Sequence, residues 1–346
     1  QESMKYGSGL WAFGGVADRF NPGGYKPSIS LAEQLLLASQ VKLMKGVEIH
    51  FPSDFKEDEV EGVQALMDEH GFEVPTICLN FFTDPKWQNG SFTSRDPKIR
   101  KEAIRTTKKA IDIAREMGVK ACTVWLGQDG HDYLFNDYDR AWEWIARGFG
   151  EVVDYARKLT VFMEYKQKEP RTHVMPANVG KALYIVGELK AKNLGVVIDV
   201  GHAFMSDENL AESVAIVNRR HVPFTMHFND AYGYWDDDMI AGSINLWKYV
   251  ELFYELRKIH YDGWYDLDIF PYREDPVKAV GQSLGFIDYV KRRVDGNYRE
   301  IKSAIAEGSV HGAIDATRKL FLAGYKYVVH ELASIKLGIN HCLAVM

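Results

Sequence analysis

Acids and histidines stand at the ends of several short apolar runs of this sequence, where they could do metal-dependent chemistry. In chain order they are His50, Glu164, Asp199, His202, His227 and Asp268. Four of them come from four consecutive runs: Glu164, Asp199, His227 and Asp268. If these four converge, like charges share a small space, which is unfavourable unless a cation compensates them. A divalent metal ion with oxygen and nitrogen ligands is the natural compensation, so the set predicts a metal site.

A run of three acids predicts a second metal site beside the first. The segment 227–238 reads His-Phe-Asn-Asp-Ala-Tyr-Gly-Tyr-Trp-Asp-Asp-Asp. Three consecutive acids are usually part of a solvated loop. These three, however, follow the run that contains His227 and are expected to lie next to Asp199 and His202. Asp236 and Asp238 could then hold a second ion, with Asp199 bridging the two.

Bringing these residues together requires a regular array of strands. Eight runs rich in β-branched and aromatic residues are predicted as strands: 5–13, 46–51, 74–81, 121–126, 161–165, 195–200, 224–229 and 264–269. Helical patterns alternate with them near 29–45, 56–70, 96–117, 139–158, 176–191, 207–220, 246–260 and 274–293. This alternation favours parallel strands joined by right-handed crossovers. Eight units favour a closed (β/α)₈ barrel, a TIM barrel, over an open sheet, and such barrels carry their chemistry at the C-terminal ends of the strands.

Local signals support these boundaries. Gly71, Gly118 and Gly195 separate a helical pattern from the next strand, where a left-handed helix C-cap is expected. Ser94 and Asp96, followed by proline, suit the start of a helix. The barrel is predicted over 4–296. Residues 297–346 read as a C-terminal helical arm without strands, and residues 1–3 as a tag remnant before a natural start at Met4.

Composition narrows the class of function. The chain has 346 residues, 46% of them hydrophobic, and a formal net charge of −6, which opposes nucleic acid as the main partner. The sequence contains no C-x-x-C pair among its three cysteines, Cys78, Cys122 and Cys342. A disulfide framework is therefore not expected, and a cytoplasmic location is predicted. Cys78 and Cys122 lie in apolar runs and read as core residues. The sequence contains no apolar run of the length that spans a membrane.

The sequence resembles the xylose isomerase family, also called glucose isomerase, from about residue 6 to about residue 294. Segment 124–130, Val-Trp-Leu-Gly-Gln-Asp-Gly, resembles the family's V-x-W-G-G-R-E-G. Segment 164–171, Glu-Tyr-Lys-Gln-Lys-Glu-Pro-Arg, matches E-x-K-x-x-E-P-R. Segment 199–202, Asp-Val-Gly-His, resembles E-V-G-H, and the acidic loop resembles the family's D-x-D segment. Further similarity lies in Gly9-Leu10-Trp11, 19–23, 80–85, 90–96 and 268–271.

Two departures from the family pattern affect the first metal site. The family has glutamate at the position of Asp199 and aspartate at the position of His227. The resulting ligand set is more similar to L-rhamnose isomerase and to ketose 3-epimerases. The identity of the sugar therefore does not follow from the resemblance.

The resemblance implies a hydride shift between C1 and C2 of an open-chain sugar, assisted by two divalent ions, Mn²⁺ or Mg²⁺, with Co²⁺ possible. One ion would be held by Glu164, Asp199, His227 and Asp268, and the other by Asp199, His202, Asp236 and Asp238. Lys166 would donate a hydrogen bond to the C1 oxygen; the alternative is that it only neutralises the acids. His50 would assist ring opening, oriented by Asp54; the alternative is a core histidine.

The resemblance also assigns substrate contacts and an assembly. Trp11, Phe82 and Trp125 would form apolar walls that exclude water from the sugar. Glu169 belongs to the same substrate-binding set. Phe20 matches a phenylalanine that reaches into the neighbouring subunit's site, which implies a homotetramer built from dimers.

Other functions compete with an isomerase. A ketose 3-epimerase on the same barrel would use one metal and two flanking acids; Lys166 and the D-x-D loop oppose it. Another sugar epimerase or a lyase on this barrel is not separated from an isomerase by the sequence. A metal-dependent endonuclease of the same barrel type would need a basic face, which the net charge of −6 opposes. A noncatalytic sugar-binding protein would not need the intact ligand set.

Overall fold

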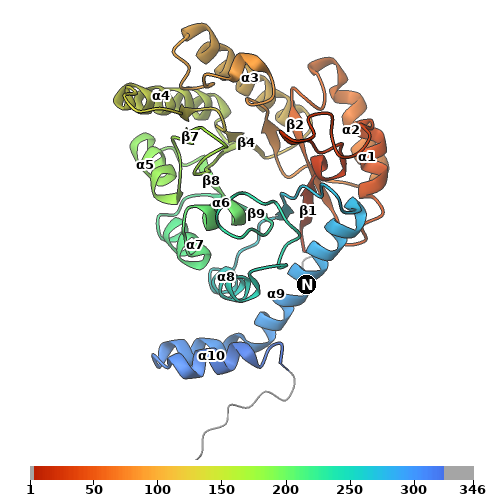
Figure 1. The fold of residues 1–346 in the computed structure, drawn as a ribbon, viewed down its shortest axis with the longest axis vertical. Helices are drawn as coiled ribbons and strands as arrows, with labels where there is room; N and C mark the ends of the chain where they lie inside the picture. Colours follow the sequence, from red (N-terminus) through yellow and green to blue (C-terminus); the bar gives the residue numbers. More distant parts are fainter. Residues whose placement is uncertain (1–3, 323–346) are drawn as a thin grey trace, which may run out of the picture. The chain divides into compact units, whose positions relative to one another are not determined.

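A closed ring of eight parallel strands forms the centre of the protein (Figure 1). The computed structural model describes residues 4–322, so the predicted tag at 1–3 and the part of the arm after 322, which includes Cys342, lie outside the described residues. The barrel strands are β1 (Tyr6–Gly9), β2 (Gly46–Phe51), β3 (Ile77–Leu79), β4 (Ala121–Trp125), β6 (Thr160–Glu164), β8 (Leu194–Asp199), β9 (Phe224–Phe228) and β10 (Tyr265–Leu267). Strand β10 pairs in parallel with β1, which closes the ring. The predicted (β/α)₈ barrel is confirmed, and the open-sheet alternative is wrong.

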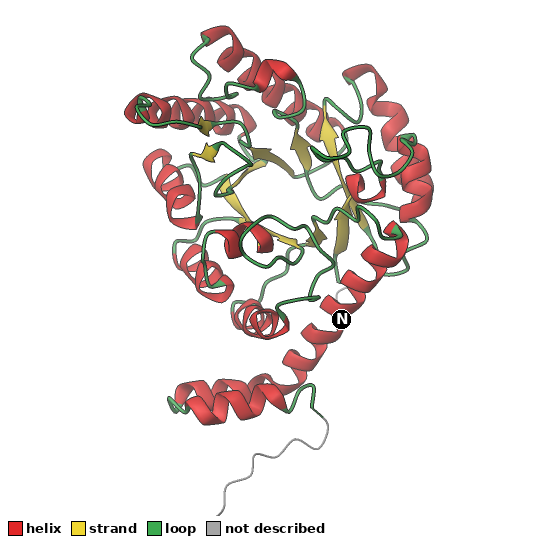
Figure 2. Ribbon diagram, in the orientation of Figure 1, coloured by secondary structure: helices red, strands yellow, loops and turns green. Residues whose placement is uncertain are grey.

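Helices surround the strands (Figure 2). Those that follow the first seven strands are α1 (Leu31–Ala38), α2 (Val60–His70), α3 (Pro97–Glu116), α4 (Tyr138–Ala156), α5 (Val179–Leu189), α7 (Leu210–Arg219) and α8 (Leu246–Lys258). Helix α4 illustrates the pattern, because its buried residues Ala141, Ile145, Phe149, Val152 and Ala156 recur every three or four positions and face one side. As predicted, α3 starts at Asp96, whose carboxylate accepts the amide hydrogen of Lys98, with Pro97 in the first turn.

Two of the three predicted glycine caps are confirmed. Gly71 and Gly118 have φ angles of 69° and 72°, the left-handed conformation that glycine adopts without strain. The prediction for Gly195 is wrong, because α5 ends at Leu189 with the left-handed Lys190 as its C-cap, and Gly195 lies within β8. A Cβ atom at Gly195 would lie 2.5 Å from the carbonyl oxygen of Pro223. Close backbone packing explains this glycine.

Some element boundaries differ from the prediction. Strand β1 ends at Gly9 and gives way to a 3₁₀-helix, Leu10–Phe13, so the predicted strand 5–13 is too long. A short helix, α6 (Val200–Met205), follows β8 directly and was not predicted. Helix α9 (Pro276–Ala306) continues well past the predicted end at 293.

The described chain divides into two compact units, with the boundary between Asp295 and Gly296. The described part of the second unit contains the end of α9 and helix α10 (Val310–Arg318), which begins at an N-cap serine, Ser309. Within residues 4–322, no helix combines the length and the apolar character needed to cross a bilayer. Cys78 and Cys122 are buried and free, which confirms that they are core residues.

Candidate metal centre and substrate pocket

A pocket of about 1100 Å³ opens at the C-terminal ends of the barrel strands. Every predicted site residue except Asp199 lines it: Trp11, Phe20, His50, Asp54, Phe82, Trp125, Glu164, Lys166, Glu169, His202, His227, Asp236, Asp238 and Asp268. Asp199 is fully buried beneath the pocket. The structure therefore brings residues from all parts of the barrel to one place.

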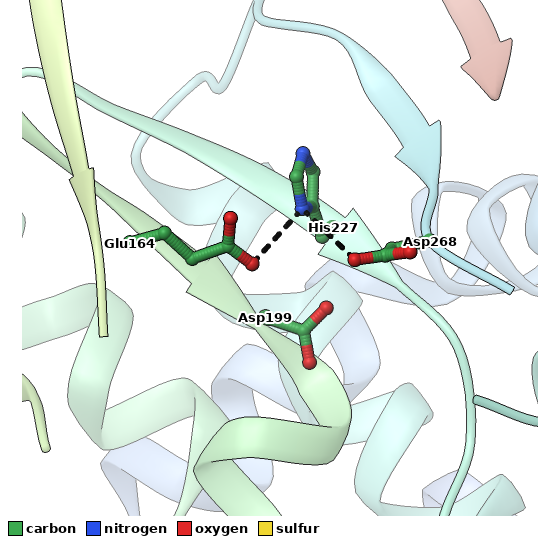
Figure 3. Close-up of side chains that lie close together, drawn as sticks. All are labelled: Glu164, Asp199, His227 and Asp268. Atoms are coloured by element: carbon green, nitrogen blue, oxygen red, sulfur yellow. Dashed lines mark ion pairs between the residues drawn. The ribbon is translucent and has the colours of Figure 1, made fainter. Parts of the chain in front are cut away.

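The first candidate metal group consists of Glu164, Asp199, His227 and Asp268 (Figure 3). One ligand atom from each lies within 4.8 Å of the others. Nδ1 of His227 is 3.3 Å from Oε1 of Glu164 and 3.7 Å from Oδ2 of Asp268. This nitrogen is buried and forms no hydrogen bond with any described residue. It is thus aimed at the carboxylates and fits a divalent cation better than an ordinary hydrogen-bond network.

The electrostatics of this group favour the binding of a cation. Burial raises the pKa of Asp268 to about 7, and the nearby carboxylates of Asp199 and Glu164 add to the effect of burial. Burial likewise raises the pKa of Asp199. The pKa of His227 lies well above its usual value, because Glu48 and Glu164 outweigh the opposing effect of burial. Without a metal, the group therefore keeps protons that a divalent ion would replace.

We expect metal affinity at this site to weaken as the pH falls through about 7. Asp268 must lose its proton to bind an ion, so each proton released should change the apparent affinity by about tenfold per pH unit. Calorimetric titration of the metal-free protein with Mn²⁺ in two buffers would measure the affinity and the protons released together. The Asp268→Asn variant should show a flatter pH dependence. A dissociation constant of the wild type that does not change with pH would contradict this expectation.

The second candidate metal group contains Asp199, His202 and Asp236. Nε2 of His202 lies 3.0 Å from Oδ2 of Asp236, and Oδ1 of Asp236 is buried and makes no hydrogen bond in the described chain. A Cβ atom at Gly201 would lie 2.7 Å from that Oδ1, so the glycine leaves room for the acid. Asp238 lines the pocket but does not belong to this three-residue group. The acidic loop thus contributes one close ligand where two were predicted.

Lys166 places a positive charge beside the second group. Its Nζ lies 2.8 Å from Oδ2 of Asp236 and 2.5 Å from Oε1 of Glu169, and 5.0 Å from the centre of the Trp125 ring. Burial lowers the pKa of Lys166, but Asp236, Glu169 and Asp238 raise it more, so it stays well above the usual value. The ammonium both faces the pocket and neutralises the acids.

The loop that carries Lys166 and Glu169 is held by backbone pairing. Strand β5 (Gly130–His131) pairs antiparallel with β7 (His173–Val174), outside the barrel. The amide of Lys166 donates to the carbonyl oxygen of Pro176 at 3.1 Å. Because Lys166 follows Glu164 by two residues, both side chains point to the same side of the extended chain. Lys166 therefore faces the pocket beside Glu164, and Glu169 of the same loop also lines the pocket.

Aromatic side chains and His50 form one wall of the pocket. Phe82 packs against Trp125 at a centroid distance of 4.6 Å, and Trp11 packs against His50 at 4.4 Å. Nε1 of Trp11 also donates to Oδ1 of Asp268 at 2.7 Å, which orients this candidate ligand. A Cβ atom at Gly9 would lie 2.0 Å from the Trp11 ring, so glycine permits the ring to fold back.

His50 and Asp54 are neighbours, but not through the imidazole ring. Oδ2 of Asp54 accepts the backbone amide hydrogen of His50 at 2.7 Å. Burial lowers the pKa of His50, so its ring is neutral at physiological pH and can accept a proton. Asp54 therefore fixes the backbone turn after β2 rather than the orientation of the ring.

Phe20 lies at the rim of the pocket with 79% of its surface exposed. Its loop is fixed by Asp18, whose Oδ1 accepts the amide hydrogens of Phe20 and Asn21, both at 2.8 Å. An exposed aromatic ring on an ordered loop suits a contact with another molecule.

Three buried residues that sequence reasoning missed support the candidate ligands. Oε2 of Glu48 lies 3.0 Å from Nε2 of His227. Nδ2 of Asn229 donates to both carboxylate oxygens of Asp199, at 3.2 and 3.0 Å. Asp266 is fully buried, and burial together with the charge of Glu48 raises its pKa well above the usual value. Each lies two positions from a predicted site residue and so points to the same side of the extended chain. The pairs are Glu48 with His50, Asn229 with His227, and Asp266 with Asp268.

The fold and the site define a class: a parallel (β/α)₈ barrel with buried acids and histidines at the C-terminal mouth. Residues 40–290 match the family described as Xylose isomerase-like TIM barrel. The chain belongs to this family.

Individual relatives agree with this assignment. A xylose isomerase from Thermus thermophilus is 28% identical over 202 residues, which cover 56% of this chain and 52% of that protein. The chain thus matches about half the length of this curated relative. Among solved structures, a D-allulose 3-epimerase from Methylomonas sp. in complex with D-allulose superposes with a TM-score of 0.65 at 16% identity, covering 83% of this chain and 97% of that chain. A D-tagatose 3-epimerase-like protein gives a TM-score of 0.65 at 20% identity, covering 84% and 100%. At these identities the structures show a shared fold.

Proposed function

We propose that this protein is a divalent-metal-dependent aldose–ketose isomerase acting on a free monosaccharide. The observation that carries the proposal is the convergence of the first candidate metal group and Lys166 in one pocket. The similarity to xylose isomerase supports the reaction class. The mixed oxygen and nitrogen donors suit Mn²⁺ or Mg²⁺, with Co²⁺ as a further option.

Each side chain has a defined task in this proposal. Glu164, Asp199, His227 and Asp268 would hold the metal, which when bound supplies Lewis-acid polarisation of the substrate oxygens. The Lys166 ammonium, fixed by Glu169 and Asp236, donates a hydrogen bond to a substrate oxygen on which negative charge develops.

The remaining pocket residues would bind and open the sugar. Neutral His50 takes up a proton during ring opening. The rings of Trp11, Phe82 and Trp125 would exclude water from the reacting carbons.

We also propose a second ion, held by Asp199, His202 and Asp236 with Asp238 nearby. Two buried atoms without hydrogen bonds, Nδ1 of His202 and Oδ1 of Asp236, support it. Lys166 competes for the same group, because it already pairs with Asp236. Metal analysis of stripped and reloaded protein should give two ions per chain. One ion per chain would contradict the two-metal mechanism.

A ketose 3-epimerase is the second candidate function. The Lys166–Asp236 ion pair favours it, because it supplies a cation to the second group without a second metal. The fold shared with 3-epimerases is compatible with it. In this case two acids that flank the substrate would exchange the proton at C3.

An activity panel tests the proposal. Pentoses, hexoses and 6-deoxyhexoses, as aldoses and as ketoses, would be incubated with chelator-treated protein and Mg²⁺, Mn²⁺ or Co²⁺. We expect one aldose–ketose pair to interconvert only when metal is present. Interconversion of two ketoses without any aldose would support the epimerase, and turnover that chelators leave unchanged would contradict both functions.

The exposed ring of Phe20 supports the proposal of a homotetramer in which this residue enters a neighbouring subunit's pocket. Sedimentation velocity would check the assembly, and a monomer at micromolar concentration would contradict it.

A further inference from the structure

The interior of the barrel directly beneath the candidate metal group is polar. Barrel interiors are usually filled by branched apolar side chains. Here Glu48 of β2 and Asp266 of β10 lie inside with 1% and 0% of their surfaces exposed, next to the buried thiol of Cys78. Burying two carboxyl groups is unfavourable unless each has a partner. Their partners therefore indicate why these acids are present.

Glu48 makes its shortest contact with His227. Oε2 of Glu48 accepts from Nε2 of His227 at 3.0 Å, and the Cys78 thiol donates to the same oxygen at 3.4 Å. The Glu48 carboxylate faces two donors and therefore acts as an acceptor, so the ring proton belongs on Nε2. The other ring nitrogen, Nδ1, is then the one that faces Glu164 and Asp268.

The buried carboxyl group of Asp266 acts on Glu48 from across β1, which lies between β10 and β2 in the barrel. Its two oxygens form no hydrogen bond with a described residue, so the interaction is between the two charges. A Cβ atom at Gly7 of β1 would lie 1.8 Å from Oδ1 of Asp266, so any other residue at Gly7 would displace this carboxyl group. Cys78 and His227 therefore hold the Glu48 carboxylate in place, and Gly7 leaves room for Asp266 beside it.

We propose that Glu48 is a positioning residue that holds the His227 ring with its proton on Nε2, so that Nδ1 is presented to the metal. The inference rests on the metal site of the proposed function. It adds a residue that never touches the ion. Carboxylates that hold a ligating histidine in this way typically change metal affinity by about 10- to 100-fold when they are removed.

Two variants of the full-length protein test the role of Glu48. Glu48→Leu removes the acceptor, and Glu48→Gln keeps an oxygen that can still accept from Nε2. Thr76→Val is the matched control, because Thr76 is buried in the same part of the barrel and bonds to Thr123 at 3.0 Å. The readouts are the Mn²⁺ dissociation constant by electron paramagnetic resonance and, on the protein loaded with diamagnetic Mg²⁺, the tautomer of His227 by ¹⁵N nuclear magnetic resonance, with its signals assigned from a His227→Gln spectrum.

We expect Glu48→Leu to weaken Mn²⁺ binding by about 10- to 100-fold and to lose the single Nε2–H tautomer. Glu48→Gln should fall between it and the wild type, and Thr76→Val should match the wild type in both readouts. The proposal would be overturned if Glu48→Leu kept the Mn²⁺ affinity and the His227 tautomer of the wild type. If Glu48→Leu does not fold, the proposal would be overturned if Glu48→Gln bound Mn²⁺ as tightly as Thr76→Val. If Glu48→Leu weakens Mn²⁺ binding as expected but the wild type converts no sugar, the proposed function is overturned and the role of Glu48 stands.

Discussion

The Asp199→Asn variant should lose more than about 10³-fold in activity, which corresponds to about 4 kcal/mol of transition-state stabilisation. Asp199 belongs to both candidate metal groups, so the substitution removes a charged ligand from each. The substitution would also replace one acceptor oxygen by an NH₂ donor facing Nδ2 of Asn229, which donates to both oxygens of the native carboxylate. The loss should appear in kcat and in bound metal, measured on the same preparation.

Asp238→Asn is the matched control for this prediction. Asp238 lines the same pocket but lies outside both groups. It should therefore have the smaller effect on activity and on metal content. If Asp238→Asn is the more damaging of the two, the assignment of Asp199 as the bridging ligand is wrong.

Lys166→Met should abolish turnover and leave the first metal in place. The ammonium contacts Asp236 and Glu169 and faces the pocket, but it is not part of the first group. Its loss removes a hydrogen-bond donor from a buried site, an effect of about 10²- to 10³-fold or more in kcat for such donors. Activity assays and metal analysis would be made in parallel.

Glu169→Gln separates the two functions of the lysine. This variant keeps Lys166 and its contact with Asp236, so it should retain more activity than Lys166→Met. Loss of the first metal in Lys166→Met would show that the lysine only neutralises the acids and is structural.

Much of the fold was predictable from periodicity and caps. Each predicted strand overlaps an observed one, because alternating strand and helix patterns persist over the whole barrel. The errors occur where tertiary contacts decide. Lys190 caps α5 in place of the expected Gly195, which packs closely against the carbonyl oxygen of Pro223. The end of α9 was missed because its residues continue the helix with no breaking residue at 293.

The candidate site was predictable where polar residues end strands, as Glu164 and Asp199 do. The buried acids beneath the site, Glu48 and Asp266, were not predicted. Glu48 lies within an apolar run, and Asp266 is close to Asp268, which is the predicted ligand because it lies near the end of the predicted strand. A simple signal was present, because Glu48 precedes His50 by two residues and Asp266 precedes Asp268 by two. On a strand, residues two apart share a face, so each pair points into the barrel. Contacts such as the Lys166–Asp236 ion pair depend on loop geometry and required the structure.

The fate of the hydrogen atoms in D₂O tests the central claim most directly. An isomerase that transfers hydride between C2 and C1 keeps the substrate's own hydrogen, whereas a 3-epimerase removes a carbon-bound proton that can exchange with solvent. Any sugar that the protein converts would be incubated in D₂O with Mn²⁺, freed of the metal, and examined by nuclear magnetic resonance. An aldose–ketose pair with protium retained at C1 is the predicted result. Deuterium at C3 of a ketose product would contradict the isomerase and identify the epimerase.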